Sequence, residues 1–141
     1  MSPRVYQLKV PAEAGCLKAV RAFVASILES ALGAEGQMVV LALDEACANI
    51  VKHRTPRVGC EDIEVRVEVE PELVRFRIGA FCAQEDLPRI RPRDLAELRP
   101  GGLGTHFIGQ IMDRIEYEAE PDRPGAMALV LEKRVPKEQR P

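Results

Sequence analysis

Residues 41–53 read LALDEACANIVKH, and this segment is the most informative in the chain. It lies in a predicted helix from about residue 37 to residue 53. Four apolar side chains share one face of that helix: Val40, Leu43, Cys47 and Ile50. Four more small or apolar side chains fall on the other side: Met38, Leu41, Ala42 and Ala48. A helix that is apolar nearly all round is expected to be buried.

Two polar residues interrupt this apolar helix. Glu45 and Asn49 are four residues apart and therefore share one face. Burying a carboxylate and an amide is costly unless something binds them. Glu45 is placed to accept a proton from an attacking hydroxyl, and Asn49 offers an amide oxygen to Mg²⁺. The alternative is a polar pair satisfied by nearby backbone and water.

A glycine-rich segment supplies the second candidate site. Its residues are Gly101, Gly102, Leu103, Gly104 and Thr105, and a helix is expected from about residue 105 to residue 112. The start of a helix offers unpaired N–H groups and a positive dipole end, which suit a phosphate. Glycines also let the backbone approach a ligand closely. Taken alone, the same segment is more typical of an ordinary loop that enters a helix.

The remaining pattern predicts an α+β fold. Strands are expected near residues 5–10, 63–70, 73–78, 115–119 and 127–131, with another helix near 12–32. Periodicity is lost from Gly79 to Gly102, which predicts a long loop. The order predicts a two-layer sandwich, a mostly antiparallel mixed sheet with helices on one face. We expect one domain over residues 1–134 and a polar, frayed C-terminal tail over 135–141.

Composition narrows the class of protein. The 141 residues are 46% hydrophobic and 30% charged, as in an ordinary globular domain. A net charge of −2 disfavours a nucleic-acid partner. No signal peptide or membrane span is apparent, so a cytoplasmic location is expected. The four cysteines form no CxxC pair and are predicted to be free thiols rather than metal ligands or disulfides.

The two candidate segments together resemble a known family. LALDEACANIVKH at residues 41–53 resembles the N-box of the GHKL ATPases, which have the Bergerat fold. PGGLGTHFIGQIMDRIEY at residues 100–117 resembles the second glycine box. This version, with a short lid and a helix that ends in Met112-Asp113 before a strand, resembles the anti-sigma factor and serine kinase branch. The resemblance covers roughly residues 17–133.

This resemblance implies a function and a set of site residues. Members of the branch bind ATP with Mg²⁺, act as homodimers and sequester a sigma factor. They also phosphorylate a serine on an anti-anti-sigma partner of the STAS fold. The proton acceptor falls on Glu45 and the magnesium-holding amide on Asn49. The phosphate-binding backbone falls on residues 101–105, and Gly79 matches a glycine of the adenine-binding box.

The adenine end departs from the family pattern. Without gaps, the family's Asp-x-Gly-x-Gly aligns with Arg77-Ile78-Gly79-Ala80-Phe81, and its Gly-Thr-Thr with Gly125-Ala126-Met127. Arginine has only donors and cannot accept a hydrogen bond from the adenine amino group. Phe81 stands where a glycine leaves room for the base. Two hypotheses follow. One is an ATP-dependent regulatory kinase, and the other is a binding module that sequesters a sigma factor or STAS partner without nucleotide.

Overall fold

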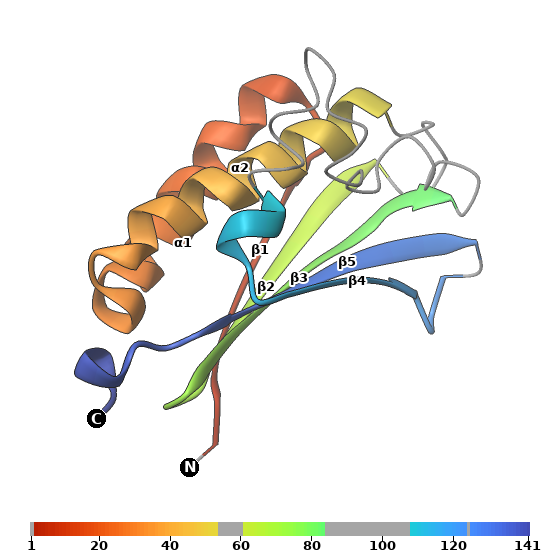
Figure 1. Ribbon diagram of the computed structural model, residues 1–141. Helices are drawn as coiled ribbons and strands as arrows, with labels where there is room; N and C mark the ends of the chain where they lie inside the picture. The colour runs from red at the N-terminus through yellow and green to blue at the C-terminus, as the bar shows by residue number, and fades with distance from the viewer. Residues whose placement is uncertain (1, 54–60, 84–107, 124) are drawn as a thin grey trace.

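The computed structural model describes residues 2–53, 61–83, 108–123 and 125–141. The chain begins with β1 (Arg4–Pro11), which is followed by α1 (Leu17–Leu32) and α2 (Glu35–His53) (Figure 1). The hairpin of β2 (Asp62–Val69) and β3 (Leu73–Ala83) comes next. The last strands are β4 (Arg114–Ala119) and β5 (Ala126–Arg134). Within the described residues, neither α1 nor α2 is long and apolar enough to cross a membrane.

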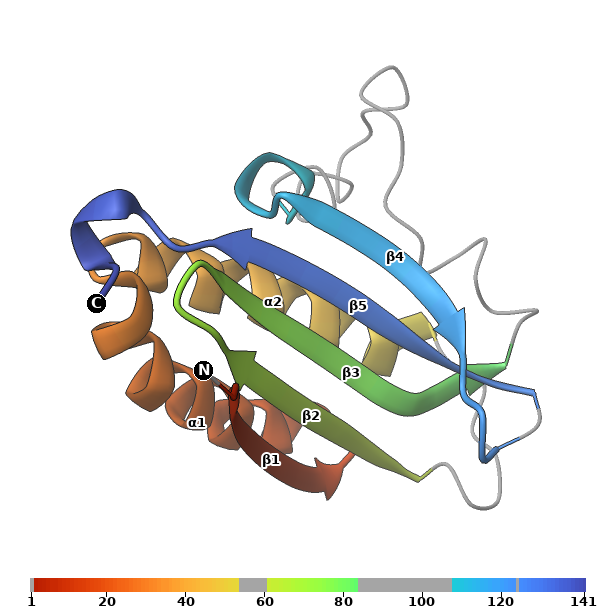
Figure 2. The same cartoon turned by 90° about the horizontal axis from the view of Figure 1, so that it is seen from below.

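The strands form one sheet in the order β1-β2-β3-β5-β4. Each described neighbouring pair is antiparallel. The sequence predicted a mostly antiparallel sheet with some parallel pairing, and these strands show no parallel pair. Both helices cover one face of the sheet, and Figure 2 shows the opposite face in front of them. We call that opposite side the open face. The two-layer α+β sandwich predicted from the sequence is confirmed.

Apolar and charged residues alternate along the strands, so the two faces of the sheet differ in character. On β2, Ile63, Val65 and Val67 are at most 2% exposed and pack toward the helices. Phe76 and Ile78 do the same on β3 and are fully buried. The charged residues between them point to the open face, because successive strand side chains point in opposite directions. The apolar sets of both strands therefore build one core beneath the helices.

Helix α1 buries the stripe expected from its 3.6-residue period. Its buried residues are Leu17, Val20, Val24, Leu28 and Leu32. The helix begins at Leu17, after a short 3-10 turn at Ala14–Cys16, and not at residue 12 as predicted. It ends at Gly33, whose φ of 58° is a conformation that favours glycine.

The C-terminal tail packs on the end of α1, so the prediction of a frayed tail is wrong. Val135 is only 3% exposed, and Lys137–Gln139 form a 3-10 turn. The Arg140 Nε donates to the Val135 carbonyl at 3.1 Å. A Cβ on Gly33 would lie 2.7 Å from the Gln139 amide, so the tail side chain fills the space above this glycine.

Strand β3 also extends further than the sequence predicted. Residues 79–83 were expected to start a loop, but they continue the strand to Ala83. The register with β5 shifts between Ile78 and Cys82. A bulge of this kind breaks the two-residue alternation, which explains why the sequence pattern stops before the strand does. The rest of the predicted loop, residues 84–102, lies outside the described residues.

Candidate functional site

Helix α2 presents the two candidate polar residues at different depths. Glu45 is exposed and Asn49 is half-buried. Four residues along a helix bring side chains to neighbouring positions on one face. The structure therefore places the carboxylate at the surface and the amide one turn further along, closer to the core. The expected cost of burying the Glu45 carboxylate does not arise.

The outer side of α2 is less buried than predicted. Met38 is 41% exposed and Leu41 is 51% exposed, so the prediction of a helix buried nearly all round is wrong. The reason is geometric, because α2 packs against α1 and the sheet and keeps one side outside the core. The buried side consists of Val39, Ala42, Leu43, Ala46, Cys47 and Ile50. Glu45 lies one turn beyond Leu41 on the exposed side.

An ion pair holds α2 to α1 beside the candidate base. The Arg21 guanidinium lies 2.9 Å from the Asp44 carboxylate. Asp44 is the residue directly before Glu45. The sequence does not indicate this pair, because a charged residue off the apolar stripe is usually solvated. The two residues are brought together by the packing of α1 against α2.

The buried side of α2 carries no reactive group. Cys47 is 1% exposed and is free in the structure. Burial, with a smaller contribution from the Asp44 charge, raises the pKa of the Cys47 thiol to about 12. A protonated thiol is a poor nucleophile and a poor metal ligand. This supports the prediction that Cys47 is a core residue, and it leaves Glu45 and Asn49 as the chemical groups of this segment.

The predicted phosphate-binding segment, Gly101, Gly102, Leu103, Gly104 and Thr105, lies outside the described residues. The structure begins again in the helix that follows it, where residues 108–111 are helical. Ile108 and Met112 are buried in the same core as α2. After the helix, the Asp113 carboxylate accepts a hydrogen bond from the Arg134 N–H at 2.7 Å. This contact connects the residues that follow the helix to β5.

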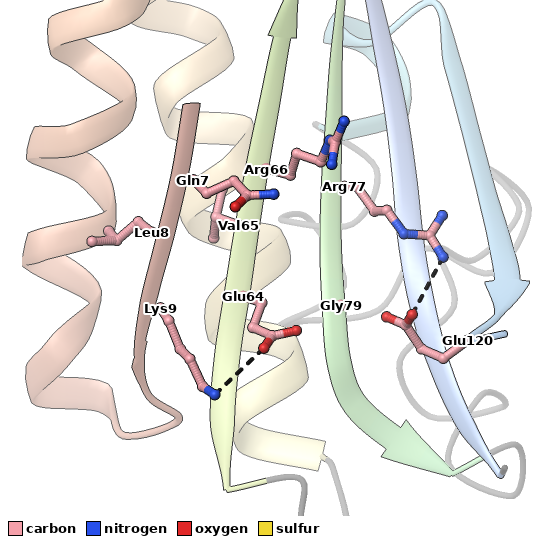
Figure 3. A pocket seen from close by; sticks show the side chains of 9 residues that line it. All are labelled: Gln7, Leu8, Lys9, Glu64, Val65, Arg66, Arg77, Gly79 and Glu120. Atoms are coloured by element: carbon pink, nitrogen blue, oxygen red, sulfur yellow. Dashed lines mark ion pairs between the residues drawn. The ribbon is translucent and has the colours of Figure 1, made fainter. Parts of the chain in front are cut away.

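Arg77 lies on the open face, away from α2. Its guanidinium pairs with Glu120 at 3.5 Å (Figure 3). It also pairs with Glu118 at 2.7 Å. The Arg77 side chain therefore lies on the side of the sheet opposite Glu45 and Asn49. Its place at the adenine acceptor position stays a prediction from the gapless alignment.

Gly79 shares the open face with Arg77. A Cβ at Gly79 would clash with the Glu120 carboxylate, which lies over the glycine. Both residues border an open-face hollow of about 430 Å³, together with Lys9, Glu64 and Arg66. The basic groups there are paired with acids, such as Lys9 with Glu64 at 3.6 Å. Any contact from Gly79 to a nucleotide on the helix side would have to come from its backbone.

Two more residues that depart from the family's adenine-binding pattern are on β5. Ala126 is buried, and Met127 is half-buried and packs against the core on the helix-covered side. Met127 pairs across the sheet with Cys82 of β3. The side chain of Phe81 lies outside the described part of the structure. Among Arg77, Ala126 and Met127, whose side chains the structure describes, Met127 packs against the core beneath the helices.

The donor set fits a magnesium ion that arrives with a nucleotide. In the described ranges there is no cluster of three or more His, Cys, Asp or Glu side chains that forms a metal site of its own. Mg²⁺ in nucleotide sites takes one or two protein oxygens and completes its shell with phosphates and water. A single half-buried amide such as Asn49 matches that requirement.

Comparison with known proteins agrees with this arrangement. The family model of the histidine kinase-like ATPase domain matches residues 10–132. The chain belongs to this family. The match runs from the end of β1 to β5, so the histidine kinase-like ATPase domain includes both helices, the whole hairpin and the segment that contains the glycines.

One curated relative is informative about the branch of the family. The domain is 29% identical over 138 residues to the serine-protein kinase RsbW of Bacillus pumilus. The alignment covers 89% of this chain and 85% of that protein. The similarity therefore extends across the fold and is not confined to one motif.

Proposed function

We propose that this protein is an ATP-binding anti-sigma regulatory factor and a serine/threonine protein kinase. Its proposed substrate is a serine of an anti-anti-sigma partner with the STAS fold. The observation that carries the proposal is the similarity to a serine-protein kinase over 89% of the chain. The position of Glu45 on the exposed side of α2 supports it, because a hydroxyl on another protein has to reach this carboxylate.

The proposed chemistry is transfer of the γ-phosphoryl group from ATP to the partner's serine. As the serine oxygen bonds to the γ-phosphorus, the Glu45 carboxylate accepts the hydroxyl proton and ADP leaves. Asn49 would hold Mg²⁺ through its amide oxygen. When bound with ATP, Mg²⁺ offsets the charge of the phosphates. The ion pair between Arg21 and Asp44 keeps this part of α2 fixed against α1.

The proposal includes the partners that the resemblance implies. These are a sigma factor and a STAS protein, bound by a homodimer in the cytoplasm. Sedimentation of the purified protein gives its mass in solution and tests the homodimer directly. A monomer at micromolar concentration would contradict that part of the proposal and leave the kinase activity to be decided separately.

The kinase activity is tested with Mg-ATP and a purified STAS-domain anti-anti-sigma protein from the same organism. We expect a phosphoserine on the STAS protein, detected by mass spectrometry. Glu45→Gln should lower the transfer rate by about 10²–10⁴-fold, the usual contribution of a positioned base. The matched control is Glu29→Gln, since Glu29 is an exposed carboxylate on α1.

A contrary result would favour the other hypothesis. Tight binding of a STAS protein or sigma factor, with no phosphoserine and no effect of ATP or of Glu45→Gln, would describe a nucleotide-independent binding module. Calorimetry with Mg-ADP separates the two cases at an early stage. The absence of heat at millimolar nucleotide would contradict the kinase proposal.

A further inference from the structure

Exposed apolar side chains lie together on the outer side of α2. Among the described residues, four large hydrophobic side chains are exposed, and two of them, Met38 and Leu41, are on this helix. The other two, Val5 and Tyr6, are on β1. Met38 and Leu41 are three residues apart, so they are neighbours on one side of α2. We call these two side chains the α2 patch.

The α2 patch is continuous with the proposed base. Glu45 is exposed and follows Leu41 by four residues, which is about one helical turn. With a rise of about 1.5 Å per residue, Leu41 lies about 6 Å and Met38 about 10 Å from Glu45 along the helix axis. A protein–protein contact of ordinary size buries about 800 Å² on each partner. A partner that brings a hydroxyl to Glu45 therefore covers the α2 patch as well.

Packing of the domain does not account for the α2 patch. The core side of α2 is built by other residues, among them Ala42, Leu43 and Ala46, each at most 3% exposed. Met38 and Leu41 leave much of their apolar surface in water, which is unfavourable relative to burial. Single exposed apolar residues are common on protein surfaces, but two that adjoin each other and a proposed catalytic group indicate a contact surface.

Two contacts with α1 hold the α2 patch in a fixed position. At Gly36, an added Cβ would lie 2.9 Å from the Leu28 carbonyl oxygen, so the first turn of α2 lies directly against α1. Further along, the Arg21 guanidinium lies 2.9 Å from the Asp44 carboxylate and joins the same two helices. The α2 patch lies between these contacts in the sequence. A surface that is already ordered loses little conformational entropy when a partner binds.

We propose that the α2 patch is the docking surface for the serine-bearing surface of the STAS partner. That partner should carry an apolar side chain about 6–10 Å from its phosphoacceptor serine, which is the spacing between Glu45 and the patch. The inference rests on the proposed function, because it takes Glu45 as the group that the serine approaches. Leu41 and Met38 are specificity-determining residues and take no part in phosphoryl transfer.

The first test measures how Leu41→Gln changes recognition of the STAS protein. Glutamine is polar but has a helix propensity similar to that of leucine, and the position is exposed, so the variant should fold. We expect the Kd and the KM for the STAS protein to rise about five- to tenfold, because less apolar surface is buried on binding. The kcat at saturating STAS protein and the KM for ATP should stay within about twofold. Leu41→Met, which stays apolar, should restore most of the affinity.

Val5→Thr is the control for a loss of exposed apolar surface elsewhere. Val5 is 43% exposed, but it lies on β1 and not on α2. The Kd for the STAS protein should be unchanged in this variant. A Kd that rises equally in Val5→Thr and Leu41→Gln would show that the effect is not specific to the α2 patch, and it would overturn the inference.

Oxidation of Met38 tests the docking surface without a catalytic step. Hydrogen peroxide converts an accessible methionine to its sulfoxide. Met38 is 41% exposed, whereas Met112 is 6% exposed and serves as an internal control. We expect saturating STAS protein to slow oxidation of Met38 about fivefold and to leave Met112 unchanged, as measured by peptide mass spectrometry. Equal oxidation of Met38 with and without the STAS protein would overturn the inference.

The two proposals fail in distinguishable ways. If Leu41→Gln binds and phosphorylates the STAS protein as the unsubstituted protein does, only the docking role of the α2 patch is overturned. If the unsubstituted protein binds the STAS protein but forms no phosphoserine, the kinase activity is overturned, and the Kd of Leu41→Gln and the oxidation of Met38 still decide where the partner docks. No binding of the STAS protein overturns both proposals.

Discussion

The Nε of Arg75 lies 2.8 Å from a carboxylate oxygen of Glu132 and joins β3 to β5 across the open face. Arg114 approaches the same oxygen at 3.4 Å, and the Glu132 side chain is only 11% exposed. Burial by itself raises the pKa of Glu132. The hydrogen bonds and charges of Arg75 and Arg114 outweigh that effect, and the pKa is lowered.

This pairing predicts an acid dependence of stability. Because the folded pKa is lowered, the contribution of Glu132 is fully present above the unfolded carboxyl pKa of about 4.3 and is lost as pH falls through the folded value. Urea unfolding at pH 7 should show Glu132→Gln less stable by about 1–3 kcal/mol. The difference should shrink toward pH 3. A gap that is constant between pH 7 and pH 3 would contradict the assignment.

The position of Arg77 predicts that it does not affect the nucleotide. Arg77→Ala removes the pairs with Glu118 and Glu120 on the open face. Calorimetry should find the Kd of Mg-ADP changed by less than about twofold, since no contact to the helix side is lost. A marked change in affinity would instead support the alignment that puts Arg77 at the adenine acceptor position.

Two leucines in the helices allow a matched test of burial. Leu28 on α1 is fully buried and Leu41 on α2 is 51% exposed. Leu28→Ala should lower the free energy of unfolding by about 2–5 kcal/mol, and Leu41→Ala by no more than about 0.5 kcal/mol. Denaturant titrations of both variants check this. Equal losses would mean that Leu41 is covered in solution.

Gly33 allows a test of the packing between the end of α1 and the C-terminal tail. Its φ of 58° disfavours a side chain, and a Cβ would lie 2.7 Å from the Gln139 amide. Gly33→Ala should cost about 1–3 kcal/mol of unfolding free energy. Gly15→Ala is the control, because a Cβ there meets nothing within 4 Å. Thermal unfolding that ranks the two variants equally would exclude strain at Gly33.

Two cysteines should differ in reactivity. Cys47 is buried with a pKa raised to about 12, whereas Cys16 is half-exposed. At pH 7.5, iodoacetamide should modify Cys16 and leave Cys47 unmodified in the native protein, as peptide mass spectrometry can show. Denatured protein, in which both react, serves as the control. Rapid native labelling of Cys47 would mean that α2 opens readily.

The strands and helices followed from the sequence where the apolar period was regular. Ile63, Val65 and Val67 alternate strictly and predicted their strand correctly. The prediction failed where features other than the apolar period determine the structure. The register shift after Ile78 interrupts the alternation, so the end of β3 could not be read from the sequence. The polar tail was predicted to fray, but Gln139 packs on Gly33.

The candidate site was only partly accessible from the sequence. Glu45 and Asn49 were found because polar residues interrupt an apolar helix. A gapless alignment takes no account of which face of a strand a residue occupies, and the structure puts the Arg77 side chain on the open face. The ion pair of Arg21 with Asp44 was not apparent from the sequence, since it joins two helices.

Glu132 and Lys133 are neighbours on β5 but point to opposite sides of the sheet. One completes a charged network on the open face, and the other caps a helix on the covered face. Deleting one residue upstream in β5 would reverse this assignment, sending the carboxylate toward the helices and the ammonium toward the arginines. A deletion of one residue in β5 should therefore destabilise the fold more than a point change at Glu132 or Lys133. Homologues should therefore vary in composition along this strand while keeping its length unbroken.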